Sequence, residues 1–110
     1  PFWAERLDEH FEKLRPQWPL CKRKPSEIIR SAQVCFTCEP EENILPYVLD
    51  TIGITQVMYA SDYRHWDSEF PESVRKLKSI PGLSEDQKHH VLGENAVKWF
   101  GFKPEDLPAG

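Results

Sequence analysis

The hydrophobic positions near the start of the chain follow the spacing of an α-helix. Across residues 3–14, apolar side chains recur every three or four residues, at Trp3, Leu7, Phe11 and Leu14. This pattern predicts a helix that buries one stripe of its surface. Pro16 and Pro19 end the pattern and begin a basic, proline-rich loop.

Two short apolar runs have the length of β-strands. The first covers Val34 to Cys38 and follows a short helical turn that Ser26 is expected to cap, and the second covers Gln56 to Ala60. Residues 39–53 between them predict a helix with acidic residues in its first turn and a glycine stop at its end. Both runs are apolar throughout, as is typical of parallel strands covered on both faces.

Two more helices are predicted after the second strand. One begins at Pro71, and the other begins at a capping box formed by Ser84 and Gln87 and ends at Gly101. Their apolar positions are Val74, Leu77 and Ile80 in the first helix, and Val91, Leu92, Ala96, Trp99 and Phe100 in the second. Residues 103–110 are expected to form a frayed tail.

The order helix, strand, helix, strand, helix, helix predicts an α/β fold. Strands separated by a helix normally pair in parallel. A stable sheet normally needs three or more strands, and this chain supplies two. We therefore expect residues 1–110 to form a single partial domain whose sheet is continued by further strands.

The composition fits one small domain and excludes two classes of partner. The chain has 110 residues with a net charge of -4, so it lacks the basic field that binds nucleic acid. No apolar run approaches the roughly 20 residues that span a bilayer. Three sparse cysteines and the lack of a signal-peptide pattern predict a cytoplasmic protein. The first residue is not methionine and a helical pattern is already under way at Trp3, which suggests a piece of a longer protein.

Polar and charged residues cluster after the second strand, in the stretch YASDYRHWD. Functional residues of α/β sheets gather beyond the carboxyl ends of the strands. Asp62 lies two residues past this strand, where a carboxylate can bind a divalent metal or take up a proton, and Arg64, His65 and Asp67 lie within reach. The alternative is an ordinary polar loop in which Ser61 and Asp62 cap a turn, Trp66 packs and His65 faces solvent.

Cys35 and Cys38 form the motif CFTC, which is compatible with redox chemistry or zinc binding. Redox pairs of this type normally begin a helix, whereas these two lie in an apolar strand, and the chain has no second pair of the kind a zinc ribbon needs. We expect buried, inert thiols.

Acidic residues and histidines outside this cluster have a structural interpretation as well. Glu39, Glu41 and Glu42 follow the first strand and could line the same edge of the sheet as Asp62, but the first turn of a helix also favours acids, and we favour that interpretation. His89 and His90 lie in the middle of the last helix and are predicted to be surface residues.

The stretch ASDYRHWD resembles the carboxyl-terminal end of the amidohydrolase-related family, the metal-dependent hydrolases and decarboxylases of the aminocarboxymuconate-semialdehyde decarboxylase type. The last barrel strand of that family ends in a Ser-Asp-Tyr-Pro-His pattern, and its final helix carries an Asn-Ala pair before an aromatic-Gly step. The matching residues are Ser61, Asp62, Tyr63, His65, Asn95, Ala96, Phe100 and Gly101. Upstream, PFWAERLDEHFEKL is similar to the helix after the sixth strand, and KPSEIIRSAQVCFTCE resembles the start of the seventh.

The resemblance extends over residues 1–102 but covers only the last third of a family barrel, since a complete (β/α)8 barrel has about 250 residues. It implies the carboxyl-terminal part of a TIM-like barrel, with two parallel strands and about four helices. It also implies that Asp62 is a catalytic residue and a ligand of a divalent metal, usually zinc. The family's His-x-His pair and its histidines after strands five and six have no counterpart here, so we expect the isolated chain to be inactive.

Arg64 departs from the family pattern, because it stands where proline is usual. Arginine at this place could bind a substrate carboxylate with its forked donors, or it could simply be exposed, which is the favoured interpretation. His65 follows the family pattern, and we expect it beside the substrate or packed in the loop rather than on the metal.

Two functions remain open. In the first, the chain is the carboxyl-terminal segment of an enzyme that hydrolyses or non-oxidatively decarboxylates a small carboxylate-bearing substrate. The enzyme would use a divalent metal, which is expected to be zinc. Alternatively, the chain is a non-catalytic small α/β protein or fragment that self-associates through exposed strand edges into a homo-oligomer. Neither function involves nucleic acid or a membrane.

Overall fold

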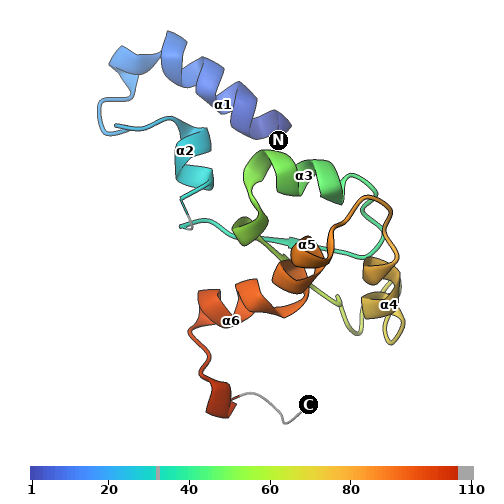
Figure 1. Cartoon of the computed structure of the whole chain (residues 1–110). Coiled ribbons are helices and arrows are strands. Elements are labelled where there is room, and N and C mark those ends of the chain that lie inside the picture. The colour runs from blue at the N-terminus through green and yellow to red at the C-terminus, as the bar shows by residue number, and fades with distance from the viewer. Residues whose placement is uncertain (32, 107–110) are drawn as a thin grey trace.

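The computed structural model describes residues 1–31 and 33–106. In this part of the chain, helices surround a small parallel sheet (Figure 1). The helices and strands are α1 (Phe2–Lys13), α2 (Pro25–Ile29), β1 (Phe36–Cys38), α3 (Leu45–Ile52), β2 (Val57–Tyr59), α4 (Ser73–Lys78), α5 (Glu85–His89), the π-helical segment η3 (His90–Glu94) and α6 (Asn95–Phe100). Single 3-10 turns cover Arg15–Gln17, Ile54–Gln56 and Pro104–Asp106. Among the helices described, none combines the length and the apolarity that crossing a membrane requires.

The two strands pair in parallel, as the order of elements predicts. Phe36 lies opposite Val57 and Cys38 lies opposite Tyr59. Both strands are three residues long and therefore shorter than the predicted runs, because Gln56 belongs to the preceding 3-10 turn and the chain leaves the ladder after Tyr59. The α/β class with two parallel strands is confirmed.

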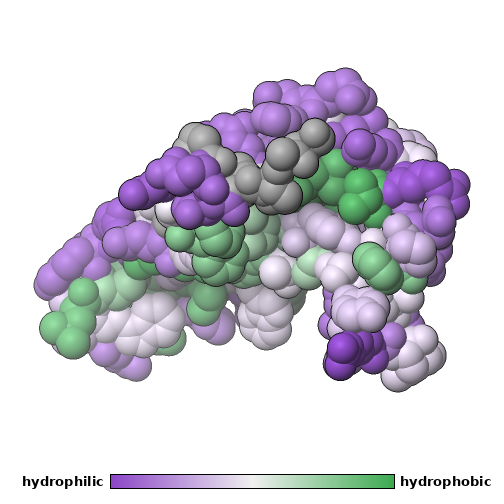
Figure 2. Space-filling view, turned by 90° about the horizontal axis from the view of Figure 1, so that it is seen from below, coloured by the Kyte–Doolittle hydropathy of each residue, from purple (hydrophilic) through white to green (hydrophobic). Residues whose placement is uncertain are grey.

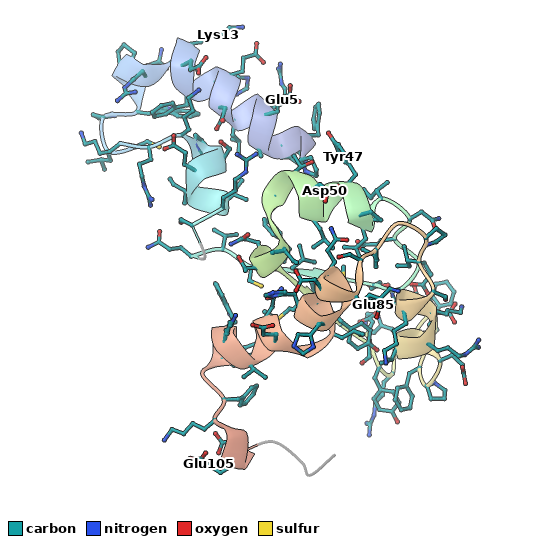
Figure 3. All side chains as sticks on the ribbon, viewed as in Figure 1. Glu5, Lys13, Tyr47, Asp50, Glu85 and Glu105 are labelled. Atoms are coloured by element: carbon teal, nitrogen blue, oxygen red, sulfur yellow. The ribbon has the colours of Figure 1, made fainter. Side chains whose placement is uncertain are left out.

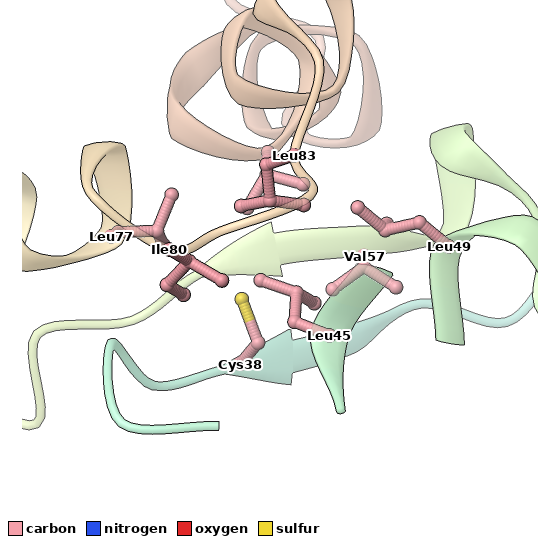
Figure 4. Packing of buried hydrophobic residues seen from close by; sticks show 8 residues of the cluster. Cys38, Leu45, Leu49, Val57, Leu77, Ile80 and Leu83 are labelled. Atoms are coloured by element: carbon pink, nitrogen blue, oxygen red, sulfur yellow. The ribbon is translucent and has the colours of Figure 1, made fainter. Parts of the chain in front are cut away.

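The hydrophobic core lies on one face of this sheet. Strand residues Cys38 and Val57 contact side chains of α3 and of the segment from α4 to η3 (Figure 4). The buried residues of the cluster are Cys38, Leu45, Leu49, Val57, Leu77, Ile80, Leu83 and Val91. Leu77 and Ile80 are thus buried as predicted, whereas Val74 is exposed, because it lies on the outer side of α4.

Helix α3 begins later than predicted. Glu39, Glu41 and Glu42 precede the helix instead of occupying its first turn, because the chain first makes two turns in which Glu42 N–H donates to the Glu39 carbonyl and Leu45 N–H donates to the Glu42 carbonyl. The prediction that these acids stabilise the helix start is therefore wrong. Gly53 ends the helix at a φ of +123°, as expected of a glycine stop.

Helix α1 forms over almost the predicted residues, but the expected buried stripe does not. Phe11 is 2% exposed, whereas Trp3 is 71% exposed and Leu7 and Leu14 are also exposed. The reason is that α1 packs mainly on the short helix α2, at one end of the molecule (Figure 1), and no other described element covers the rest of the stripe. Figure 2 shows hydrophobic side chains at the surface in several separate places.

Ser26 links these two helices rather than capping α2. It is the second residue of α2, which Lys24 precedes as N-cap. Its backbone N–H donates to Asp8 Oδ1 at 2.9 Å and its hydroxyl donates to Asp8 Oδ2 at 2.6 Å. Burial opposes the charge of Asp8, but these bonds from Ser26 hold the pKa of Asp8 below its usual value. The carboxylate of α1 thus holds the start of α2.

The last helical run begins as predicted and then changes its pitch. Ser84 and Gln87 form the capping box, with Gln87 N–H donating to Ser84 Oγ at 3.1 Å. The run passes through η3, which has π-helical hydrogen bonding, before α6 ends at Gly101 with a φ of +68°. Of the apolar positions in this run, Val91 is buried, whereas Trp99 and Phe100 are exposed. Of the expected tail, Pro104–Asp106 form a 3-10 turn, and residues 107–110 lie outside the described part.

The side chains of η3 and α6 join this helical run to β2. Asn95 is buried, and its amide donates to the carbonyls of Ile54 and Val57, each at 2.7 Å. His90 Nδ1 lies 3.0 Å from Asn95 Oδ1, and its side chain is 15% exposed. The prediction of a surface position is therefore wrong for His90, because its ring hydrogen-bonds the buried Asn95 side chain. His89 is exposed, as predicted.

A second bond attaches the same run to α3. The side-chain amide of Gln87, in α5, donates to Asp50 Oδ1 in α3 at 3.1 Å. Figure 3 labels Asp50 and, next to the start of α5, Glu85. This polar bond therefore joins α5 to α3.

Candidate metal-binding site

The candidate site lies in the loop that follows β2. Ala60 N–H, one residue past β2, still donates to the Cys38 carbonyl at 3.0 Å. The loop therefore begins directly at the carboxyl ends of both strands. The hydroxyl of Tyr59 lies 2.5 Å from Ser73 Oγ, at the start of α4. The two ends of the loop are thus attached to the sheet and to a helix.

Hydrogen bonds and unusual backbone angles shape the loop itself. His65 N–H donates to the Asp62 carbonyl at 3.0 Å, and Ser68 Oγ donates to the Ser61 carbonyl at 2.7 Å. Asp62 has a φ of +49° and Arg64 a φ of +81°, the left-handed region that side chains with a Cβ rarely adopt. The loop therefore holds two strained residues on either side of Tyr63.

Three possible metal ligands meet in this loop. Asp62 Oδ2 lies 2.9 Å from His65 Nδ1. A carboxylate oxygen of Asp67 joins them, so that the ligand atoms of the three residues all lie within 4.8 Å of one another. One imidazole nitrogen and two carboxylate oxygens are donors that zinc and other divalent metals accept, so the residues present fit such an ion.

Glu39 adds a third acidic group, beside Asp62 and Asp67, from the neighbouring strand end. Desolvation raises the pKa of Glu39, and repulsion from Asp62, Glu41 and Asp67 raises it further. The carboxyl ends of β1 and β2 therefore combine into a region of concentrated negative charge. This arrangement favours the interpretation that the acids after β1 line the same edge as Asp62.

The aromatic and basic side chains of the loop, Tyr63, Arg64, Trp66 and Phe70, are exposed. The guanidinium of Arg64 lies 5.7 Å from the centre of the Tyr63 ring, and the Tyr63 ring meets Phe70 edge to face with their centres 4.9 Å apart. Trp66 is 95% exposed, so it does not pack inside the loop as the polar-loop alternative expects, whereas the His65 side chain is 71% exposed and faces solvent as that alternative expects. Arg64 is exposed, in accordance with the favoured interpretation.

Of the CFTC motif, only Cys38 lies in the core. Cys38 is buried, and burial raises the pKa of its thiol to about 12, with a further contribution from the charge of Glu42. Cys35 is half-buried, and burial raises its pKa as well. All three cysteines are free thiols.

The structure thus brings together Asp62 and His65 and leaves Arg64 at the rim. The sequence placed Asp67 within reach of Asp62 and allowed Glu39 to line the same edge, but it did not single out either as a site residue. The signal for Glu39 was its place directly after β1, which matches the place of Asp62 after β2. Asp67 lies five residues after Asp62, and only the turn at His65 brings the two carboxylates together.

Comparisons with known proteins give the family and the fold of this chain. The family model of the amidohydrolases matches residues 2–102. The crystal structure of a 5-carboxyvanillate decarboxylase from Sphingomonas paucimobilis matches with a TM-score of 0.75 and 28% sequence identity, over 94% of this chain and 31% of the decarboxylase. No curated protein matches.

The two matches agree on the kind of protein. The family match extends over both strands, the loop of Asp62 and the helical run from Ser84 to Gly101. The structural match spans less than a third of the decarboxylase, as expected for part of a barrel. The chain belongs to the amidohydrolase family.

Proposed function

We propose that this chain is the carboxyl-terminal segment of a metal-dependent amidohydrolase-type enzyme, and that Asp62 is the metal ligand and catalytic carboxylate that it contributes. The observation that carries this proposal is the meeting of Asp62, His65 and Asp67 at the carboxyl end of β2, in a chain of this family. A bound divalent metal, zinc in our proposal, would supply Lewis-acid chemistry. Asp62 would hold the ion and exchange a proton with the substrate.

The proposed substrate is a small carboxylate-bearing molecule. The matched structure is that of a 5-carboxyvanillate decarboxylase, which supports decarboxylation over hydrolysis. Arg64 is exposed at the rim of the site, where its guanidinium could bind a substrate carboxylate through two parallel bonds. His65 would orient Asp62 through its contact of 2.9 Å and face the substrate with its other ring nitrogen.

The free thiols support a reducing compartment. We therefore retain the cytoplasm as the proposed location.

The test is a metal titration of the complete enzyme with Asp62→Asn. The amide cannot supply a negative oxygen, so we expect metal affinity to fall at least tenfold and turnover to be lost. Glu105→Gln is the control, because Glu105 is an exposed acid in the last 3-10 turn. Affinity and turnover that stay unchanged in Asp62→Asn would refute the assignment.

A further inference from the structure

The ring of His90, in the last helical run, has its proton placed by its neighbours. The side-chain amide of Asn95 donates to the carbonyls of Ile54 and Val57, so the remaining atom, Asn95 Oδ1, can only accept. His90 Nδ1 lies 3.0 Å from this oxygen and therefore carries a proton. In the neutral ring the other nitrogen, Nε2, then has a lone pair that is available to a ligand.

This acceptor nitrogen lies beside carboxylates. His90 Nε2 is 3.6 Å from Glu94 Oε2 and 4.0 Å from Asp86 Oδ1. Lys98 Nζ binds the other oxygen of Glu94, and this bond lowers the pKa of Glu94 against the opposing effect of desolvation. Glu94 is therefore charged at neutral pH, and its oxygen faces the lone pair of a neutral His90. A cation between the two atoms removes this repulsion, whether it is a proton or a metal ion.

A second imidazole lies at the same carboxylate oxygen. His89 Nε2 is 3.4 Å from Glu94 Oε2. In an α-helix with 3.6 residues per turn, residues five apart point about 140° away from each other. Here they meet because η3 is π-helical, and Asn95 N–H donates to the carbonyl of His90, five residues back. The π-helical turn thus gathers two imidazole nitrogens around one carboxylate oxygen.

The separations of these atoms fit a shared metal ion better than direct hydrogen bonds. The nitrogen-to-oxygen distances of 3.4 Å and 3.6 Å exceed the roughly 2.7 to 3.2 Å of a typical N–H···O bond. Zinc bonds of about 2.0 to 2.1 Å place two ligands of a tetrahedral ion about 3.3 Å apart. A metal-binding histidine also normally donates its other ring N–H to a nearby acceptor, as His90 does to Asn95.

Solvent and ions can reach this group of side chains. The side chain of His89 is 75% exposed, and His89, Gly93 and Glu94 line a hollow of about 860 Å³. A Cβ at Gly93 would meet nothing within 4 Å, so the backbone beside the group is open. The exposed His89 ring can turn toward an ion, and Asp86 or water can supply a fourth ligand.

We propose that His89, His90 and Glu94 bind a zinc ion at the π-helical turn, outside the loop of Asp62. Two imidazole nitrogens and a carboxylate oxygen are ligands that zinc accepts. The ion would hold the ring of His90, and the bonds from His90 to Asn95 and from Asn95 to the Val57 carbonyl would carry this restraint to β2. The proposal is independent of the reaction proposed for Asp62.

The test is calorimetric titration of the complete 110-residue chain with zinc chloride, in a background of Asp62→Asn that removes the carboxylate of the other candidate site. His89→Ala in this background should lower zinc affinity at least tenfold, because it removes one ligand at an exposed position. His10→Ala is the matched control, since His10 is an exposed histidine of α1. It should leave the affinity unchanged.

The melting temperature tests the proposed restraint on β2. Zinc at a hundredfold excess over its Kd should raise the Tm of the Asp62→Asn chain by about 5 °C or more. At the same zinc concentration, a tenfold loss of affinity in His89→Ala should halve this rise, because stabilisation follows the logarithm of the ratio of free zinc to Kd.

Long-range 1H–15N NMR spectra of the imidazole rings give a second reading, on the unmodified chain. We expect zinc to shift the Nε2 resonances of His89 and His90, to leave Nδ1 of His90 protonated and to leave His10 unchanged. A shift confined to His65 would place the ion in the loop of Asp62. That result would overturn this proposal while supporting the function proposed above.

Two further results would overturn the proposal. The first is equal zinc affinity with and without His89→Ala. The second is a His90 ring that keeps protons on both nitrogens in excess zinc at neutral pH, which would identify the contact with Glu94 as an ion pair.

Discussion

The side-chain amide of Asn95 donates to the carbonyl of Val57, the first residue of β2, at 2.7 Å. The same amide also bonds the Ile54 carbonyl, and the oxygen of the Asn95 side chain lies 3.0 Å from His90 Nδ1. Because Asn95 Oδ1 can only accept, His90 must donate through Nδ1. This connection attaches the last helical run to the strand that leads to Asp62.

Replacing Asn95 by leucine should destabilise the chain. The two carbonyls would lose their donor in a buried place, which costs about 2 to 4 kcal/mol of unfolding free energy. Urea unfolding followed by circular dichroism measures this loss. Asn43→Leu is the control, because Asn43 is exposed, and an equal loss in both variants would contradict the role of the Asn95 bonds.

Replacing Arg64 by glycine should raise the unfolding free energy of the chain. The φ of +81° at Arg64 strains any residue with a Cβ, and glycine relieves about 1 kcal/mol of that strain. Arg64→Ala keeps the Cβ and removes the charge, so it should show no gain in urea unfolding. A similar gain for both variants would show that the charge, and not the backbone, is unfavourable. Arg64→Pro should disrupt the loop, because proline is fixed near a φ of -65°.

Replacing Gly53 and Gly93 by alanine should change the unfolding free energy in opposite directions. A Cβ at Gly53 would lie 2.3 Å from Gln56 Oε1, and the φ of +123° is unfavourable as well, so Gly53→Ala should cost about 2 kcal/mol or more. A Cβ at Gly93 meets nothing within 4 Å, and Gly93 lies within a helical run, so Gly93→Ala should stabilise by about 0.5 kcal/mol or more. Thermal unfolding of the pair distinguishes them, and a loss at both positions would contradict this reading of the backbone.

Cys38 should make stability depend on alkaline pH. Burial raises the pKa of its thiol from 9.0 to about 12. Below about pH 9 the thiol is protonated in both the folded and the unfolded chain, so its contribution to the unfolding free energy is complete. This contribution is lost as the pH rises from about 9 to about 12, because the unfolded chain loses the proton first. Unfolding free energies of the natural chain and of Cys38→Val should diverge over that range. A difference that stays constant with pH would show that burial does not raise the pKa of Cys38.

The sequence predicted those features that depend on neighbours along the chain. Ser84 and Gln87 identify a helix start because both partners of the capping box lie three residues apart. Asp62 could be identified because it directly follows an apolar run, and the ends of strands are where α/β proteins place their functional groups.

Features that depend on distant segments could not be predicted in the same way. The spacing of Trp3, Leu7 and Leu14 shows that they share a side of a helix, but not whether anything covers that side. His90 looks like a surface histidine until Asn95 and the carbonyl of Val57 are placed beside it. Asp67 joins Asp62 only through the turn at His65, whose left-handed residues no simple pattern predicts.

The contact of Asp8 with Ser26 also bears on the order in which parts of the chain open. Asp8, Ser26 and the ion pair of Lys24 with Glu12 hold α1 to α2, while the apolar cluster lies around the strands. The bonds from Arg30 Nε to the Thr51 carbonyl and from Gln56 Nε2 to the Arg30 carbonyl join the two parts. Amide hydrogens of α1 should therefore exchange with solvent through a local opening of lower free energy than those of β2. The melting temperature of the sheet and the helices around it would then not apply to α1 and α2, which would open at a lower temperature.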